Sequence, residues 1–247
     1  MPLTHVREND VVWETCIWRT INLREKFNQF FYFPIERNGA HGRQNFAYML
    51  WDAMARGDIP IYADDEFKIP LDNFAFVERY TRADTMYLEV IDEDDEESFE
   101  YQTVLIPKDF SSEDVLQVRL KEAWYIEKQE TGQYVRILGL ALAQDMYKEV
   151  DGDREFQGTI NLFWIPMLSP QVRTLFARKE AYYEDNIAHL PTWLSIFTER
   201  MFDTYVTRVS NTFNRAIIDY LTGEDAILES ERIEDHLLDI SMDQWEW

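Results

Sequence analysis

The sequence predicts an α+β fold in which amphipathic helices at both ends flank a central antiparallel sheet. Near both ends of the chain, apolar residues recur at intervals of three and four, as in helices with one buried face. In the middle, apolar and polar residues alternate, as in half-buried strands. Turn signals such as Thr131-Gly132 and Asp151-Gly152 leave intervals too short for parallel crossovers. We therefore expect an antiparallel meander.

The segment Asp10–Pro34 predicts an aromatic-rich helix followed by an apolar extended stretch that ends at proline. Trp13, Ile17 and Ile21 lie four residues apart and would form one stripe of a helix. Asp10 is well placed as the N-cap. The simplest interpretation is a helix that packs on the core, with the single cysteine, Cys16, as a small hydrophobe near its apolar stripe.

The next hundred residues or so alternate between helix and strand signals. Because adjacent carboxylates cannot all leave water, the acidic run Asp92–Glu97 must be a solvated turn. The predicted elements are a helix at Gln44–Arg56 before Gly57, irregular structure with a short edge strand at 59–69, a helix at Asp72–Tyr80, and a hairpin of strands near 86–90 and 99–105.

The segment 111–128 admits two interpretations. Ser111-Ser112 could cap a helix, but Val118, Leu120, Trp124 and Ile126 keep a period of two that is broken only at Glu122. We prefer a strand, followed by the strands of the meander near Tyr134–Ala141 and Thr159–Ile165.

The last third is predicted to be helical. Ser169-Pro170 is an N-cap followed by proline at the first helical position. Two further helices are predicted, a long one capped by Thr192 with the stripe Leu194, Phe197, Met201 and Tyr205, and one with the stripe Phe213, Ile217 and Leu221. We expect one domain over 1–222, with a subdivision near 107–112, and an acidic helical tail over 223–247.

Composition limits the classes of function. The chain has 47 acidic and 24 basic residues, and a net charge of −23. Such a protein is repelled by phosphate backbones and anionic lipids, so we expect no binding to nucleic acid or to membrane surfaces. No apolar run approaches the roughly 20 residues that span a bilayer, so we expect no direct membrane insertion. With 8 Trp, 13 Tyr and 16 Phe, the chain has ample apolar material for a core and for interfaces.

The sequence shows no clear catalytic or metal-binding motif. The four histidines are scattered, and one cysteine cannot form an internal disulfide. Asp151-Gly152-Asp153 is similar to the start of a calcium loop, but the glycine is second instead of sixth. We therefore expect no enzyme activity, cofactor or metal. The alternative is a periplasmic hydrolase or a calcium-dependent binding module, which would need carboxylates, or Cys16 and a histidine, to converge in one cleft.

Strings along nearly the whole chain resemble the GldN/PorN family, whose members are periplasmic components of the type IX secretion and gliding apparatus. Each string is short, but they occur in one order from end to end. They are Trp18-Arg19, Ile21, Leu23–Lys26, Asn28 and Tyr32–Pro34; Arg119–Glu122, Trp124-Tyr125 and Tyr134–Gly139; Leu162–Ile165 and Pro170; Trp193, Phe197, Arg200–Phe202, Tyr205 and Asn211; and Ala226, Glu229, Glu231–Ile233 and Trp245.

The resemblance implies a non-catalytic structural protein in a periplasmic ring beneath the outer membrane. Its implied partners are an outer-membrane lipoprotein of the GldK/PorK type, periplasmic domains of the GldM/PorM type, and further copies of itself. Met1–His5 lacks the basic and apolar stretches of an export signal, which by itself suggests the cytoplasm. The resemblance instead implies a mature periplasmic protein whose signal has been removed.

Large aromatics and the apolar stripe of the tail are the predicted protein-binding residues, because Trp buries much area at small entropic cost. The tail could equally pack back on its own domain. The candidate residues are Trp13, Trp18, Ile233, Leu237, Trp245 and Trp247.

Overall fold

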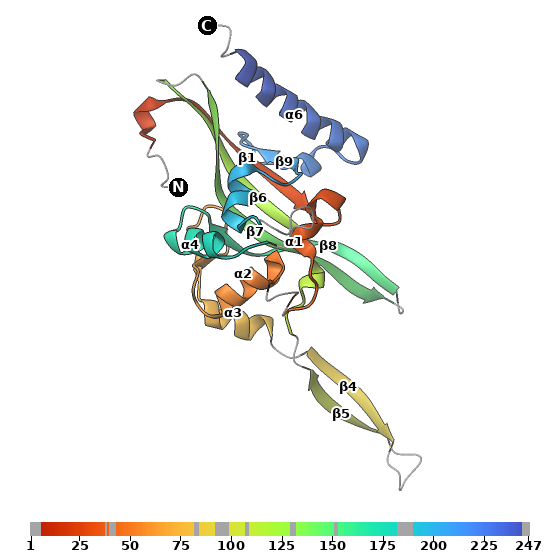
Figure 1. The fold of residues 1–247 in the computed structure, drawn as a ribbon. Helices are drawn as coiled ribbons and strands as arrows, with labels where there is room; N and C mark the ends of the chain where they lie inside the picture. Colours follow the sequence, from red (N-terminus) through yellow and green to blue (C-terminus); the bar gives the residue numbers. More distant parts are fainter. Residues whose placement is uncertain are drawn as a thin grey trace.

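The computed structural model describes residues 6–37, 39, 43–81, 84–91, 99–106, 109–128, 132–150, 153–181 and 190–243. Its centre is a seven-stranded antiparallel sheet with strand order β3-β2-β8-β7-β6-β1-β9, which confirms the α+β fold (Figure 1). The strands are β1 (Val11–Asn22), β2 (Ile61–Tyr62), β3 (Pro70–Leu71), β6 (Val115–Glu127), β7 (Gln133–Val150), β8 (Asp153–Pro166) and β9 (Tyr205–Val209).

The helices lie at two places on the sheet. In Figure 1, α2, α3 and α4 gather beside the lower part of the sheet, and α6 crosses its upper end near β1 and β9. The α-helices are α1 (Gln29–Tyr32), α2 (Phe46–Ala55), α3 (Asn73–Tyr80), α4 (Pro170–Arg178), α5 (Trp193–Glu199) and α6 (Glu224–Asp243). The 3-10 turns are η1 (Glu8–Asp10), η2 (Lys26–Asn28), η4 (Ser112–Asp114) and η5 (Ile217–Asp219).

The predicted hairpin forms a second sheet of its own. Strand β4 (Asp84–Ile91) pairs with β5 (Phe99–Ile106) in an antiparallel register, and the pair projects away from the main body (Figure 1). The acidic run Asp92–Glu97 lies outside the described residues. The seven-stranded sheet draws strands from both sides of the proposed 107–112 boundary.

The N-terminal helix is the main wrong prediction, because Val11–Asn22 is a strand. A spacing of four fits a strand as well as a helix, since it is a multiple of the two-residue period. The segment is rich in β-branched and aromatic residues, which favour a pleated surface. The helical structure that follows is restricted to the turn η2 and the single turn α1.

The long helix predicted after Thr192 is also wrong. Thr192 caps α5 as expected by accepting a hydrogen bond from Ser195, but the helix ends at Arg200. Arg200 has a left-handed backbone with φ of 53°, which turns the chain, and Tyr205 then begins β9. The stripe Phe213, Ile217 and Leu221 does not form a helix either, because only the turn η5 is helical there.

Several other predictions are confirmed. Helix α2 is capped by Asn45 and followed by Gly57 with φ of 75°, a backbone conformation that glycine adopts without strain. Proline begins α4. The segment 111–128 is a strand after one 3-10 turn, and β6, β7 and β8 form the meander.

Two hydrophobic cores occupy the covered face of the sheet. The larger one contains a cluster of aromatic rings around Phe31, Phe46 and Trp193, whose centroids lie 4.8–5.3 Å apart. The smaller one is formed by Ile17, Val206, Ile217 and Leu237. Ile21, two positions after Arg19 on β1, belongs to the larger core, so β1 runs past both.

Candidate protein-interaction surfaces

Helix α6 packs on the chain's own sheet through one apolar face. Leu237 is 4% exposed and lies in the smaller core with Ile17 and Val206, and Ile233 packs against the same core. Ser230 is buried beside them and accepts a hydrogen bond of 2.9 Å from the backbone nitrogen of Val206. The helical spacing read from the tail is thus confirmed, and its partner in this structure is β1 and β9.

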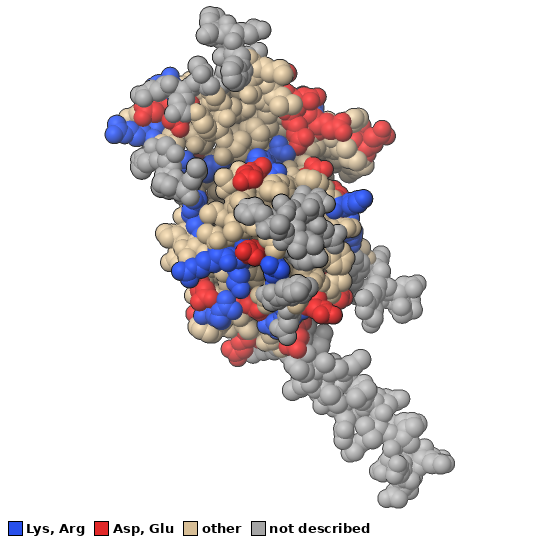
Figure 2. All heavy atoms as spheres, viewed as in Figure 1, with Lys and Arg blue, Asp and Glu red and all other residues tan. Residues whose placement is uncertain are grey.

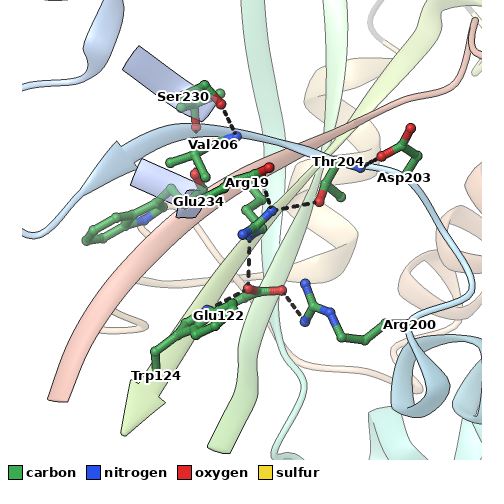
Figure 3. A network of polar contacts seen from close by, with 11 residues as sticks. Arg19, Glu122, Trp124, Arg200, Asp203, Thr204, Val206, Ser230 and Glu234 are labelled. Atoms are coloured by element: carbon green, nitrogen blue, oxygen red, sulfur yellow. Dashed lines mark hydrogen bonds and ion pairs between the residues drawn. The ribbon is translucent and has the colours of Figure 1, made fainter. Parts of the chain in front are cut away.

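A buried arginine connects α6 to the sheet (Figure 3). Arg19 of β1 is 7% exposed, and its Nη1 lies 2.6 Å from Glu234 Oε1 of α6. The same nitrogen donates to the hydroxyl of Thr204 at 3.2 Å. The guanidinium also lies over the ring of Trp124, 5.6 Å from its centroid. The contact with Glu234 ties α6 to β1, while Thr204 and Trp124 hold the guanidinium in place.

Glu122 of β6 is the centre of this polar network, and its side chain is fully buried. It accepts hydrogen bonds from Arg200 at 2.7 Å and from the Trp124 indole nitrogen at 3.0 Å (Figure 3). Arg19 Nε lies 3.4 Å from its second oxygen. A buried carboxylate is tolerated when cations and donors surround it. Here the donors come from β6 and the end of α5, and β1 adds the positive charge of Arg19.

The opposite face of the sheet carries a second cluster, around Trp18. Strand neighbours point to opposite faces, so Trp18 lies on the face away from Arg19 and α6. Its indole nitrogen donates to Asp65 Oδ2 at 2.7 Å. Arg208 donates to the same oxygen at 2.7 Å, and its guanidinium lies 3.6 Å from the centroid of the Trp18 ring. Lys121 Nζ donates to the backbone oxygen of Asp65 at 2.8 Å.

A groove of about 380 Å³ lies on this face, beside Trp18. Arg119, one of its lining residues, is half-buried, and burial lowers the pKa of its guanidinium. The Nε atom of Arg119 is buried without a hydrogen-bond partner. Within the described part of the chain, no carboxylate pairs with this side chain. The groove is lined by Trp18, Thr20, Asp65, Gln117, Arg119, Thr159, Asn161, Trp164, Tyr205, Thr207, Arg208, Ala216 and Ile218.

Cys16 lies on the same face as Trp18, two positions earlier on β1. Burial raises the pKa of its thiol, so at neutral pH it is protonated and weakly nucleophilic. His236 is exposed on α6, which covers the other face of the sheet. The other three histidines lie outside the described residues. Cys16 and His236 are therefore not brought together.

The family model described as "Gliding motility associated protein GldN" matches residues 6–246, nearly the whole chain. The chain belongs to the GldN family. The resemblance carried by the sequence strings is thereby confirmed, and GldN family membership associates the chain with gliding motility. A search of curated proteins found no match.

The candidate binding residues separate into three groups in this GldN family member. Ile233 and Leu237 pack inside the chain, and Trp13 is half-buried against the same smaller core. Trp18 lines the groove on the opposite face. Trp245 and Trp247 lie outside the described residues.

The sequence did not indicate the polar residues around these candidates. They are Asp65, Arg119 and Arg208 beside Trp18, and the Arg19–Glu122–Arg200 network beside α6. One signal was available: Glu122 breaks the alternation of β6, and a charged residue at a core position implies buried partners. The partners themselves are distant in sequence, and no local pattern indicates them.

The described residues contain no cluster of histidine, cysteine or carboxylate side chains able to hold a metal ion. Asp151-Gly152 and the run Asp92–Glu97 are not among them. Three surface depressions of the described chain are each lined by a single carboxylate, namely Asp65, Glu180 or Glu199. None of the described helices has the length and apolar character needed to cross a membrane.

Proposed function

We propose that this chain is a non-catalytic structural component of the type IX secretion and gliding machinery. It forms a periplasmic ring with an outer-membrane lipoprotein of the GldK/PorK type and contacts periplasmic domains of the GldM/PorM type. The observation that carries this proposal is the GldN family match, because it covers both cores, the groove and α6 as one unit.

The surface supports a role in binding proteins. The described residues place four large apolar side chains on the outer face of α6, at 53–66% exposure, and two more beside the groove, Tyr205 and Ile218, at 40% and 73%. Exposed apolar groups gathered on particular elements are typical of interaction surfaces. A chain with a charge of −23 calls for at least one basic partner face, so its association with that partner weakens as salt is added.

Light scattering coupled to size exclusion tests the proposal. The full chain is mixed with the soluble domain of the lipoprotein encoded by the same organism, and the mass of each species is measured at low and high salt. We expect a joint species that grows toward large assemblies. Two independent peaks at micromolar concentration would reject the proposed ring with this partner.

The same mixture distinguishes the alternative of a calcium-dependent module. The measurement is repeated with excess Ca²⁺ and with a chelator. A structural component of the proposed kind assembles equally with Ca²⁺ and with the chelator, because its side chains contact the partner directly and no Ca²⁺ ion takes part. Assembly only in Ca²⁺ would favour the calcium-dependent module instead.

A further inference from the structure

We infer that copies of this chain associate head to tail, with the outer face of α6 in one copy seated in the groove beside Trp18 in the next. The inference deepens the ring assembly proposed above and rests on it. Its basis is a pair of complementary surfaces on opposite faces of the same end of the sheet.

The outer face of α6 is a second stripe, distinct from the one buried on the sheet. From Ile227 onward, five of its six residues recur at intervals of four, four, three and four, and the sixth, Leu228, follows Ile227 directly. All six therefore share one side of the helix. Four are apolar and two acidic, and all are exposed: Ile227, Leu228, Glu231, Asp235, Leu238 and Met242. We call this set the outer stripe. Figure 2 shows acidic side chains gathered at the upper right, where α6 begins.

The two carboxylates of the outer stripe lie between its apolar pairs. Ile227 and Leu228 precede them, and Leu238 and Met242 follow. Within the described chain, neither Glu231 nor Asp235 has an ion-pair partner, whereas their neighbours Glu229 and Glu234 pair with Arg232 and Arg19.

The groove has the complementary arrangement. Arg119 is a lining cation with a buried, unsatisfied nitrogen, and Arg208 adds a second positive charge that is balanced by Asp65. Aromatic and apolar side chains surround them, including Trp18, Tyr205 and Ile218. A guanidinium in this position gains most from a carboxylate, which it binds through two parallel hydrogen bonds. The occupant should therefore present carboxylates flanked by apolar groups, which is what the outer stripe presents.

The placement of the two surfaces determines how copies would associate. Trp18 and Arg19 point to opposite faces of β1, and α6 is held by Arg19 while the groove begins at Trp18. One neighbour cannot contact both faces of the sheet at once. The contact is therefore heterologous, and repetition of it builds a ring when the rotation between copies closes.

Two variants, each with one defective surface, test the inference with the full chain. Arg119→Glu inactivates the groove, and Glu231→Arg with Asp235→Arg inactivates the outer stripe. The masses of the wild type, of each variant, and of an equal mixture of the variants are measured by analytical ultracentrifugation over a range of concentrations at fixed salt. Arg119→Gln, which adds no carboxylate beside Asp65, is a second groove variant, and circular dichroism checks that each variant is folded.

Matched controls change the net charge equally at remote exposed positions. Arg178→Glu, on α4, is the control for the groove variant, and Glu36→Arg with Glu78→Arg is the control for the stripe variant. Both controls should associate like the wild type, because the inference depends on a local pair of surfaces and not on total charge.

We expect the wild type to form species whose mass rises with concentration, and each variant alone to remain monomeric. The mixture should give a dimer and nothing larger, because only one functional groove and one functional stripe remain to pair. A wild type that stays monomeric at every concentration, a variant that associates like the wild type, or a mixture that stays monomeric would each overturn the inference.

Binding to the lipoprotein tests the proposed function independently of this inference. The Arg119→Glu variant is mixed with the lipoprotein's soluble domain in the same experiment. A joint species together with unchanged self-association would reject the groove contact and retain the proposed function. If Arg119→Glu abolishes self-association and the chain forms no joint species with the lipoprotein, the groove contact is retained and the proposed partner is rejected.

Discussion

Arg200 Nη1 lies 2.7 Å from Glu122 Oε1, although the two residues are separated by 78 positions in the chain. The contact depends on the left-handed turn at Arg200, which ends α5 and brings the guanidinium to β6. Because Glu122 also contacts Arg19, and Arg19 contacts Glu234, the end of α5 and the tail helix are connected through one buried carboxylate.

The first prediction concerns that carboxylate. Glu122→Gln should lower the free energy of unfolding by about 3 kcal/mol, because it leaves Arg19 buried opposite a neutral group. Urea unfolding followed by tryptophan fluorescence measures the change. Glu199→Gln is the control, since Glu199 is exposed in the last turn of α5. Equal stability of the two variants would show that the network contributes little.

The second prediction compares neighbouring leucines of α6. Leu237→Ala should cost about 2–4 kcal/mol, because it leaves a cavity between α6 and the sheet. Leu238 is 59% exposed, and Leu238→Ala should change the unfolding free energy by less than about 0.5 kcal/mol. Denaturant unfolding of both variants checks the difference. A reversed order would mean that the helix packs through its other face.

The third prediction concerns removal of residues 224–247. The deletion exposes Ile17, Val206 and Ile217 and removes the Glu234 partner of Arg19. We expect the larger core to remain folded while β9 loses protection from hydrogen exchange, because β9 pairs with the sheet along one edge only. Exchange of peptides from β9 and from β6 measures the two effects. Full protection of β9 in the truncated chain would contradict the packing of α6 described above.

The fourth prediction uses the raised pKa of Cys16. Above the ordinary thiol pKa of 9.0, an unfolded chain loses this proton while the folded chain keeps it. The folded state then binds more protons than the unfolded state, so stability falls as the pH rises through that value. Unfolding free energies measured on both sides of pH 9 give the slope. Cys16→Ala should flatten it, and an unchanged slope in this variant would assign the effect to other groups.

The sequence predicted the parts of the fold that have strong local signals. Helix α2 is followed by Gly57, and α4 begins with Ser169-Pro170, so local chemistry defines the end of the first and the start of the second. The alternation in β6 similarly distinguishes a strand from a helix, and the segment is a strand.

The failures occurred where local and tertiary signals differ. Trp13, Ile17 and Ile21 fit two periods equally well, and pairing with both β6 and β9 decides in favour of the strand. The stripe that runs from Leu194 to Tyr205 continues in sequence, but the chain turns at Arg200, where the guanidinium meets Glu122. Neither outcome depends on residues nearby in the sequence.

The same limit applies to the interaction surfaces. Trp18 could be selected because tryptophan is frequent at interfaces, but its environment comes from Asp65, Lys121 and Arg208, which lie in three other segments. Arg119 carries no local signal at all. Its significance arises from a buried nitrogen without a partner, which is a property of the folded chain.

The pairing of strand β1 on both edges determines how the chain responds to mechanical force. It is hydrogen-bonded along one edge to β6 from Val11 to Asn22 and along the other edge to β9 from Ile17 to Thr20. These bonds run perpendicular to the strand, so a force directed along β1 loads them together in shear. A force that lifts α6 from the sheet acts on one apolar face and a few polar contacts. Under tension, the tail helix would therefore detach well before the central strand slides.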